Sequence, residues 1–231
     1  VVNADLSNDD ALWSVGRAEH AVRLVPTAPN YRNTLGIAHF RCRAWDAADI
    51  AFRSGMELNL GGSAWDWFFL AMIAAERGDS DRARHWFDAA TFWMAIFRAD
   101  NRELVRFRSE AAARLGIPEA SLPTDADFAA IGAALIAADP NLECYWIVKG
   151  RAETKLRAFS WTEAKADFAR AVELRRDADE LEQYQWAALL ARAGDEAAYR
   201  EQCRKLLAQY AKTTDPMWAE RIGKACLLLP A

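Results

Sequence analysis

Apolar residues recur along much of the chain at the spacing of an amphipathic α-helix. Residues three and four positions apart lie on one face of a helix, so this pattern predicts helices with one buried side. In 101–115 the opposite face carries arginine and glutamate, and we expect a capping helix there. We interpret 11–28 as a partial repeat that contributes one helix. The apolar stripes are Leu104, Phe107, Ala111 and Leu115 in the first segment, and Leu12, Val15, Ala18, Val22 and Val25 in the second.

Two stretches of the chain repeat one another at a fixed offset. Three pairs of matching residues are each 35 positions apart: Gly36 and Ala71, Ala48 and Ala83, and Phe52 and Phe87. Small residues let two helices approach closely, and a phenylalanine can then fill the space beside the crossing. A single helical hairpin cannot bury its apolar face alone, so such copies stack. The spacing predicts hairpin repeats over about 30–62 and 64–97.

Two weaker copies follow, over about 141–175 and 180–211. In the third copy we assign Gly150 to the small position and Phe168 to the phenylalanine position, which makes the first half two residues longer than before. In the fourth copy Cys203 replaces the phenylalanine. Further helices are expected over 124–138 and 215–229.

Helix-start signals support these boundaries. Asp79 and Asp195 stand where they can cap second helices. Ser160, with Glu163 three residues later, has the spacing of a capping box. Pro29 and Pro140 stand at the start of first helices, where a missing N–H does no harm.

Glycine and proline also divide the chain. Gly116, Pro118 and Pro123 interrupt the helical pattern, because these residue types end helices. We therefore expect a first lobe at 1–116, a linker at 117–123 and a second lobe at 124–231. The sequence leaves open whether the lobes stack continuously or hinge.

Composition narrows the function. The 231 residues carry a net charge of −4 with no basic block, which argues against nucleic-acid binding, and no apolar run has the length of a membrane helix. The four cysteines and three histidines show no metal-ligand or redox spacing, and no phosphate-binding or nucleophile motif occurs. We expect no enzyme activity, no cofactor and no membrane partner. Thiols without disulfide spacing favour the cytoplasm, and both ends look cut from a longer polypeptide.

At its repeats the chain resembles the tetratricopeptide repeat family. The resemblance rests on nine residues: Leu35, Gly36, Ala48 and Phe52 in the first copy, and Trp67, Leu70, Ala83, Phe87 and Ala90 in the second. It departs from the family at His39 and Ala74, where tyrosine is common, and at Leu60, where the closing proline is usual. The resemblance implies an all-α, right-handed superhelical solenoid of antiparallel hairpins, with about ten to eleven helices.

A narrower resemblance is to the repeat regions of large planctomycete-type bacterial proteins. It is carried by the segments 33–38, 67–72, 107–111 and 215–230. Such proteins often carry a serine/threonine kinase domain or a WD40 propeller. The resemblance implies a regulatory or scaffolding role for the parent protein.

The family binds peptides in a concave groove lined by the first helices of its repeats. Carried over to this chain, the groove would be apolar and aromatic at one end and cationic at the other, suited to a protein segment with an apolar anchor and an acidic end. The positions that would line it are Asn30, Asn33, Ile37, Phe40, Arg41, Trp65, Phe68, Met72, Arg151, Lys155, Tyr184 and Arg192.

Two alternatives stay open. Trp65 and Phe68 could pack against neighbouring repeats instead of facing a ligand. The whole array could also be a structural spacer that self-associates without a specific ligand, through an apolar patch near Trp218 and 227–229.

Overall fold

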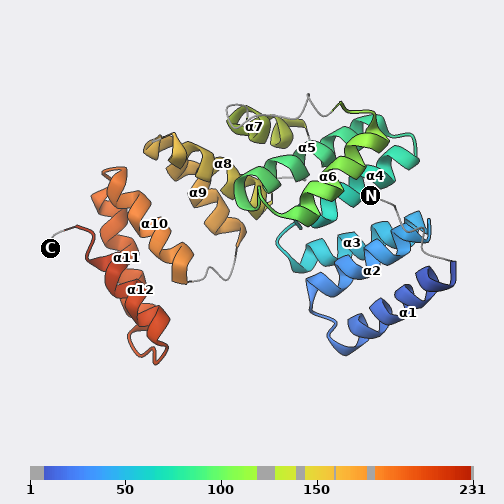
Figure 1. The fold of residues 1–231 in the computed structure, drawn as a ribbon. Helices are drawn as coiled ribbons and strands as arrows, with labels where there is room; N and C mark the ends of the chain where they lie inside the picture. The colour runs from blue at the N-terminus through green and yellow to red at the C-terminus, as the bar shows by residue number, and fades with distance from the viewer. Residues whose placement is uncertain (1–7, 119–127, 139–143, 159, 176–179, 230–231) are drawn as a thin grey trace. The chain divides into compact units, whose positions relative to one another are not determined.

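The structure is a computed structural model that describes residues 8–118, 128–138, 144–158, 160–175 and 180–229 (Figure 1). Within these ranges it contains twelve α-helices and no strand, which confirms the all-α prediction with one helix more than the upper expected number. The hand of the superhelix stays a prediction. No helix in the described ranges combines the length and apolar character that crossing a membrane requires.

From α1 to α6 the connections between successive helices are three to five residues long. Their bounds are α1 Asn8–Leu24, α2 Pro29–Arg41, α3 Trp45–Leu58, α4 Ala64–Glu76, α5 Ser80–Phe97, α6 Arg102–Leu115, α7 Phe128–Ala138, α8 Tyr145–Arg157, α9 Trp161–Leu174, α10 Glu180–Arg192, α11 Glu196–Tyr210 and α12 Pro216–Cys226.

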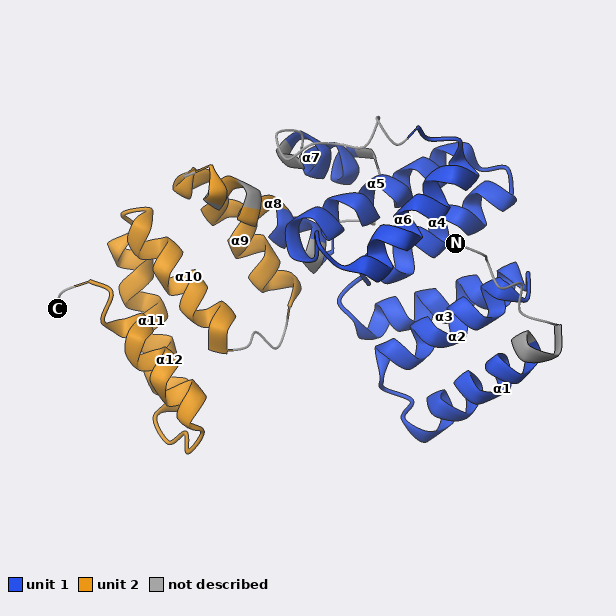
Figure 2. Ribbon diagram, viewed as in Figure 1, with its two compact units in different colours: residues 1–150 blue, residues 151–231 orange. Residues whose placement is uncertain are grey.

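The chain forms two compact units, residues 1–150 and 151–231, coloured separately in Figure 2. This division differs from the predicted break at 117–123, part of which lies outside the described residues. The reason is that α7 packs on α5, and Leu135 joins the buried core of unit 1 with Ile131 and Ile136 against it. Ile147 of α8 belongs to the same core.

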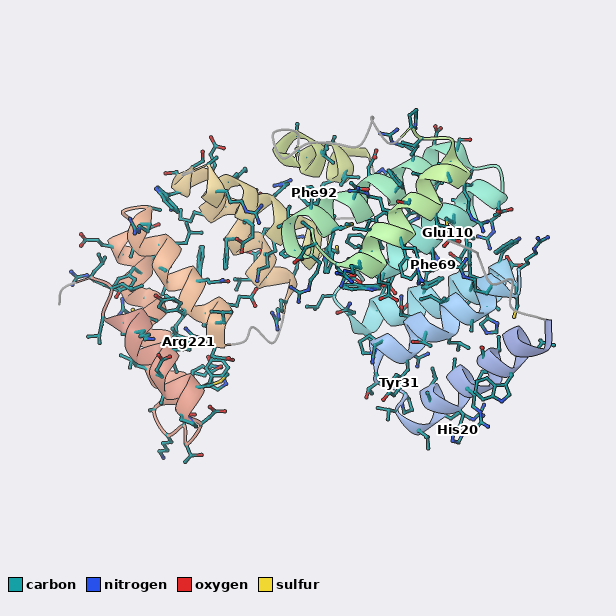
Figure 3. The ribbon with its side chains drawn as sticks, viewed as in Figure 1. His20, Tyr31, Phe69, Phe92, Glu110 and Arg221 are labelled. Atoms are coloured by element: carbon teal, nitrogen blue, oxygen red, sulfur yellow. The ribbon has the colours of Figure 1, made fainter. Side chains whose placement is uncertain are left out.

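The two strong repeats form the predicted hairpins, α2 with α3 and α4 with α5. Gly36 lies at the close crossing of the first hairpin: a Cβ atom there would stand 2.7 Å from the Phe52 ring. Phe69 then connects several helices, because its ring contacts Phe40 at 5.0 Å, Phe52 at 5.5 Å and Phe107 at 4.8 Å between centroids (Figure 3). The predicted capping helix α6 therefore closes this core with Phe107.

The third copy has a different register from the predicted one. Ala152, not Gly150, shares a buried cluster with Ala164 and Phe168. Gly150 instead faces Phe92 of α5, whose ring would stand 2.7 Å from an added Cβ. The distance in sequence from Ala152 to Phe168 equals that from Gly36 to Phe52, so the apparent two-residue extension is absent.

In the segment predicted as the fourth copy, α10 packs on α11. Cys203 is buried with Ala187 and Leu206, in the place that phenylalanine holds in the other copies. The Tyr199 hydroxyl donates to the carbonyl of Ala225 at 2.9 Å and accepts from the backbone N–H of Leu228 at 3.1 Å. It thereby holds the segment after α12 against α11.

The second helices start with one shared backbone conformation. Asp79 (φ −90°, ψ 81°) and Asp195 (φ −90°, ψ 71°) each accept a hydrogen bond from the N–H three residues on, as predicted. Ser160 has φ −85° and ψ 65°, yet its side chain makes no cap, so the predicted capping box does not form. At nearly the same backbone angles the two aspartate carboxylates thus accept from the helix amides, and the Ser160 hydroxyl does not. Pro29 begins α2 as expected, and Pro140 lies outside the described residues.

Candidate functional site

Unit 1 contains a cavity of about 490 Å³. Its walls come from α2, from the end of α3 and the start of α4, and from the end of α5, the start of α6 and Arg98 between them. The described residues that line it are Pro29, Asn30, Asn33, Thr34, Ile37, Gly55, Asn59, Ser63, Trp65, Asp66, Trp93, Arg98 and Glu103.

Four of the predicted groove residues meet in this cavity. Asn30, Asn33 and Ile37 come from the first helix of the first repeat, and Trp65 comes from the first helix of the second. Three and four positions separate the residues of α2, so one helix face presents all three. The repeat position of these residues therefore predicted their common direction.

A buried carboxylate fixes the wall between α2 and α4. Asp66 is only 4% exposed and accepts from Asn33 Nδ2 at 2.9 Å. It also accepts from the Ser63 backbone N–H at 3.0 Å and the Ser63 hydroxyl at 3.1 Å. Burial raises the pKa of the Asp66 carboxyl above its ordinary value, although these hydrogen bonds oppose the shift.

Two tryptophans and a glutamate also line the cavity. The Trp65 indole Nε1 donates to Glu103 Oε2 at 2.9 Å. The rings of Trp65 and Trp93 meet edge to face, with centroids 5.5 Å apart. Trp65 is partly exposed, whereas Trp93 is buried at the end of α5.

Sequence reasoning missed several lining residues. Ser63 and Asp66 have capping-box spacing, which was a usable signal for a helix start with a buried acid. Trp93 and Glu103 carried no such signal, because they belong to a second helix and to a helix interpreted only as a cap. Their approach to Trp65 depends on how α5 and α6 pack on α4.

Three predicted groove residues are core residues instead, so their assignment was wrong. Phe40, Phe68 and Met72 are fully buried, and Phe68 packs on Phe87 with centroids 5.9 Å apart. The reason is that α4 contacts α2, α3, α5 and α6, which leaves little of its surface exposed. For Phe68 the packing alternative holds, whereas Trp65 keeps a surface in the cavity.

Arg41 is held by a partner on α6. Its guanidinium donates to both oxygens of Glu110, at 2.5 and 2.7 Å (Glu110 is labelled in Figure 3). Burial opposes ionisation of Glu110, but the hydrogen bonds and charge of Arg41, with help from Arg114, keep its pKa below the ordinary value. A planar fork held by two bonds has limited capacity to bind a further anion.

The predicted cationic residues of unit 2 also have partners. Arg151 donates to both oxygens of Asp167, and Lys155 Nζ lies 2.8 Å from Asp167 Oδ2. Burial opposes ionisation of Asp167, but these two cations outweigh it and hold the pKa of its carboxyl below the ordinary value.

The two remaining groove residues take part in cation–π pairs. Arg221 lies over the Tyr184 ring at 5.9 Å, and Arg192 lies over the Trp161 ring at 5.8 Å. A groove that continues from the cavity into residues 151–231 stays a prediction. Among the described residues, no three histidine, cysteine or acidic side chains gather as a metal site would require.

Comparison with known proteins gives several structural matches, including the two that follow. The crystal structure of PilW, a widely conserved type IV pilus biogenesis factor, aligns with 89% of this chain and 89% of its own, at 16% identity and a TM-score of 0.38. An assembly chaperone of RpL4 (Acl4) aligns over 95% of this chain and 91% of its own, at 17% identity and a TM-score of 0.34. No family model and no curated protein matches the sequence. Similarity at this level establishes neither a family nor a role, so the functional argument rests on the cavity itself.

Proposed function

We propose that this chain is a protein-interaction module that binds a segment of a partner protein in the cavity of unit 1. One observation carries the proposal: first helices of two successive repeats converge on a cavity of about 490 Å³. This volume lies within the range of roughly 300–1,000 Å³ that is typical of ligand pockets. It suits one or two side chains of a partner together with the adjoining backbone.

The walls have the composition of a recognition site. Ile37, Trp65 and Trp93 supply apolar and aromatic surface, and Asn30 and Asn33 supply amides that can bond a peptide backbone. The carboxylates already have partners, since Asp66 accepts from Ser63 and Asn33, and Glu103 accepts from Trp65. This arrangement favours binding over acid–base catalysis. In the parent protein we infer a regulatory or scaffolding role, in keeping with the sequence resemblance.

Self-association without a specific ligand is the second candidate. It is favoured by exposed apolar side chains around α12, where Leu227 is 82% and Met217 is 60% exposed. Such side chains can mark an interface between copies.

A cavity-blocking variant tests the first candidate. Thr34 is exposed at the edge of the cavity, so Thr34→Trp fills the space without removing a core contact. Thr162→Trp, on the exposed surface of α9, is the matched control. Random peptides of about twelve residues are selected on the wild-type chain and then measured by fluorescence anisotropy on all three proteins, with folding checked by circular dichroism.

We expect Thr34→Trp to lose at least about tenfold in affinity, and Thr162→Trp to bind like the wild type. Equal binding by all three folded proteins would remove the cavity from consideration. Failure to enrich any peptide, together with sedimentation as a dimer, would favour self-association instead.

A further inference from the structure

We propose that the occupant of the cavity is a cationic side chain, the lysine ammonium or arginine guanidinium of the partner segment. This inference rests on the proposed function and specifies its ligand. The starting observation is the charge of the walls. Among the described lining residues, Asp66 and Glu103 bring two carboxylates, and Arg98 brings one guanidinium.

The positions of these charges favour a cation inside the cavity. Asp66 is buried in the wall, whereas Arg98 is an exposed residue whose Nη1 donates to the carbonyl of Phe97 at 3.0 Å. A charge that is removed from water acts more strongly than one exposed to it, because the effective dielectric constant is lower. Glu103 is exposed like Arg98, so these two charges offset one another, and the buried Asp66 carboxylate leaves the cavity walls net negative.

The residues of the walls also carry hydrogen-bond acceptors. Asn33 uses its amide nitrogen to donate to Asp66, which leaves its carbonyl oxygen Oδ1 as an acceptor on a lining residue. Glu103 accepts from Trp65 through Oε2, and no described residue donates to Oε1. Lysine and arginine side chains are donors only, so they match these acceptors.

The aromatic wall suits the same ligand. Trp65 is partly exposed in the cavity and stands edge to face with Trp93. Tryptophan is the aromatic residue that attracts a cation most strongly over its ring face. A bound cation would be attracted both by the carboxylate of Glu103 and by the face of the indole ring beside it. The sequence alone suggested an apolar anchor at this aromatic end of the groove, and an acidic side chain placed here would meet the two carboxylates.

Four small probes separate charge from shape. They are the N-acetyl methylamides of lysine, arginine, norleucine and glutamate, of which norleucine matches the length of lysine without the charge. Each is titrated into the ¹⁵N-labelled full chain, and the indole N–H signals of Trp65 and Trp93 are followed by NMR. The signals are assigned with Trp65→Phe and Trp93→Phe.

We expect the lysine and arginine probes to move both signals and to bind at least about fivefold more tightly than norleucine, with no binding of glutamate. Glu103→Gln keeps the shape of the wall and removes one charge, so it should lower the affinity for the lysine and arginine probes by about three- to tenfold. Glu57→Gln, an exposed residue of α3 outside the cavity, makes the same charge change and should leave binding unaltered. Raising ionic strength from about 0.05 M to about 0.5 M should weaken binding further.

Several results would overturn the cationic assignment. They are equal binding of norleucine and lysine, tighter binding of glutamate, no response of either indole signal to any probe, or equal effects of Glu103→Gln and Glu57→Gln. The peptide selection described above separates failure of the cationic assignment from failure of the proposed function. Selected peptides that need the cavity but lack lysine and arginine would leave the proposed function standing and remove this inference. Absence of any cavity-dependent peptide would remove both.

Discussion

Among the described residues, each unit buries one aspartate beside residues of its predicted groove helices, and the two aspartates differ in the charge of their partners. In unit 1, Asp66 accepts from a neutral amide, a backbone N–H and a hydroxyl. In unit 2, Asp167 accepts from the cations Arg151 and Lys155. Neutral donors do not compensate the loss of hydration of Asp66, so its pKa rises, whereas two cations more than compensate it for Asp167, whose pKa falls.

The position of each aspartate in its repeat decides what a ligand can reach. Asp66 is on the first helix of the second repeat and binds Asn33 of the first repeat, which orients that amide at the edge of the cavity. Asp167 is on the second helix of its own repeat and neutralises the cations of the first helix. A polar residue at a groove position is thus available to a partner only if no charge on the paired helix has already engaged it.

Replacing each aspartate by asparagine should give the largest difference in stability loss between the two units. Asp167→Asn leaves Arg151 and Lys155, each less than a third exposed, without a counter-charge. Allowing for that exposure, we expect the free energy of unfolding to fall by about 2–3 kcal/mol at neutral pH. Asp66→Asn removes a penalised charge and disturbs only hydrogen bonds to neutral groups, so its cost should stay below about 1 kcal/mol.

Urea unfolding followed by NMR signals from each unit measures both variants in the full chain, where the two units need not unfold together. A larger loss for Asp66→Asn than for Asp167→Asn would contradict the assigned roles. Circular dichroism in the absence of urea confirms that both variants start folded.

The stability contributions of Asp66 and Asp167 should depend on pH with opposite signs. The folded pKa of Asp167 lies below its reference of 3.8, so its stabilisation is complete above 3.8 and is lost as the pH falls through the folded value. The stability difference between wild type and Asp167→Asn should therefore shrink in acid. The folded pKa of Asp66 lies above 3.8, so its contribution is complete below 3.8 and is lost as the pH rises through the folded value.

The free energy of unfolding of the wild-type chain should thus rise relative to that of Asp66→Asn as the pH is lowered towards 3.8. The two differences are measured on the same samples by repeating the urea series at several pH values. Parallel changes at the two sites would show that burial and neighbouring charges do not act as argued here.

Local spacing explains why the fold of the strong repeats could be predicted. The matches of Gly36 with Ala71 and Phe52 with Phe87 lie within single hairpins, where the contacts between paired helices follow from nearby residues. In the third copy two small residues, Gly150 and Ala152, stand two positions apart, and spacing alone selected the wrong one. Phe92 of a preceding helix decides that register, because its ring leaves no room for a side chain at Gly150.

The site could be predicted only in part for the same reason. Asn30, Asn33 and Ile37 were found because one helix face presents them. Phe68 was misassigned because the burial of α4 depends on helices that follow it in the chain. Contacts across many residues carry no local pattern, so they become visible only in the structure.

The smallest predicted effect concerns the starts of two second helices. Asp79 caps α5 by accepting from the backbone N–H of Arg82 at 3.0 Å, whereas Ser160 has nearly the same backbone conformation before α9 and makes no cap. Ser160→Asp should therefore gain a capping bond and a favourable interaction with the helix dipole, raising the free energy of unfolding by about 0.5–1 kcal/mol. The reciprocal variant Asp79→Ser should lose a similar amount, because Ser160 makes no cap from nearly the same backbone angles. Thermal unfolding measures the stability of both variants. If aspartate is no more stabilising than serine at either position, the choice of side chain does not explain the missing cap at Ser160.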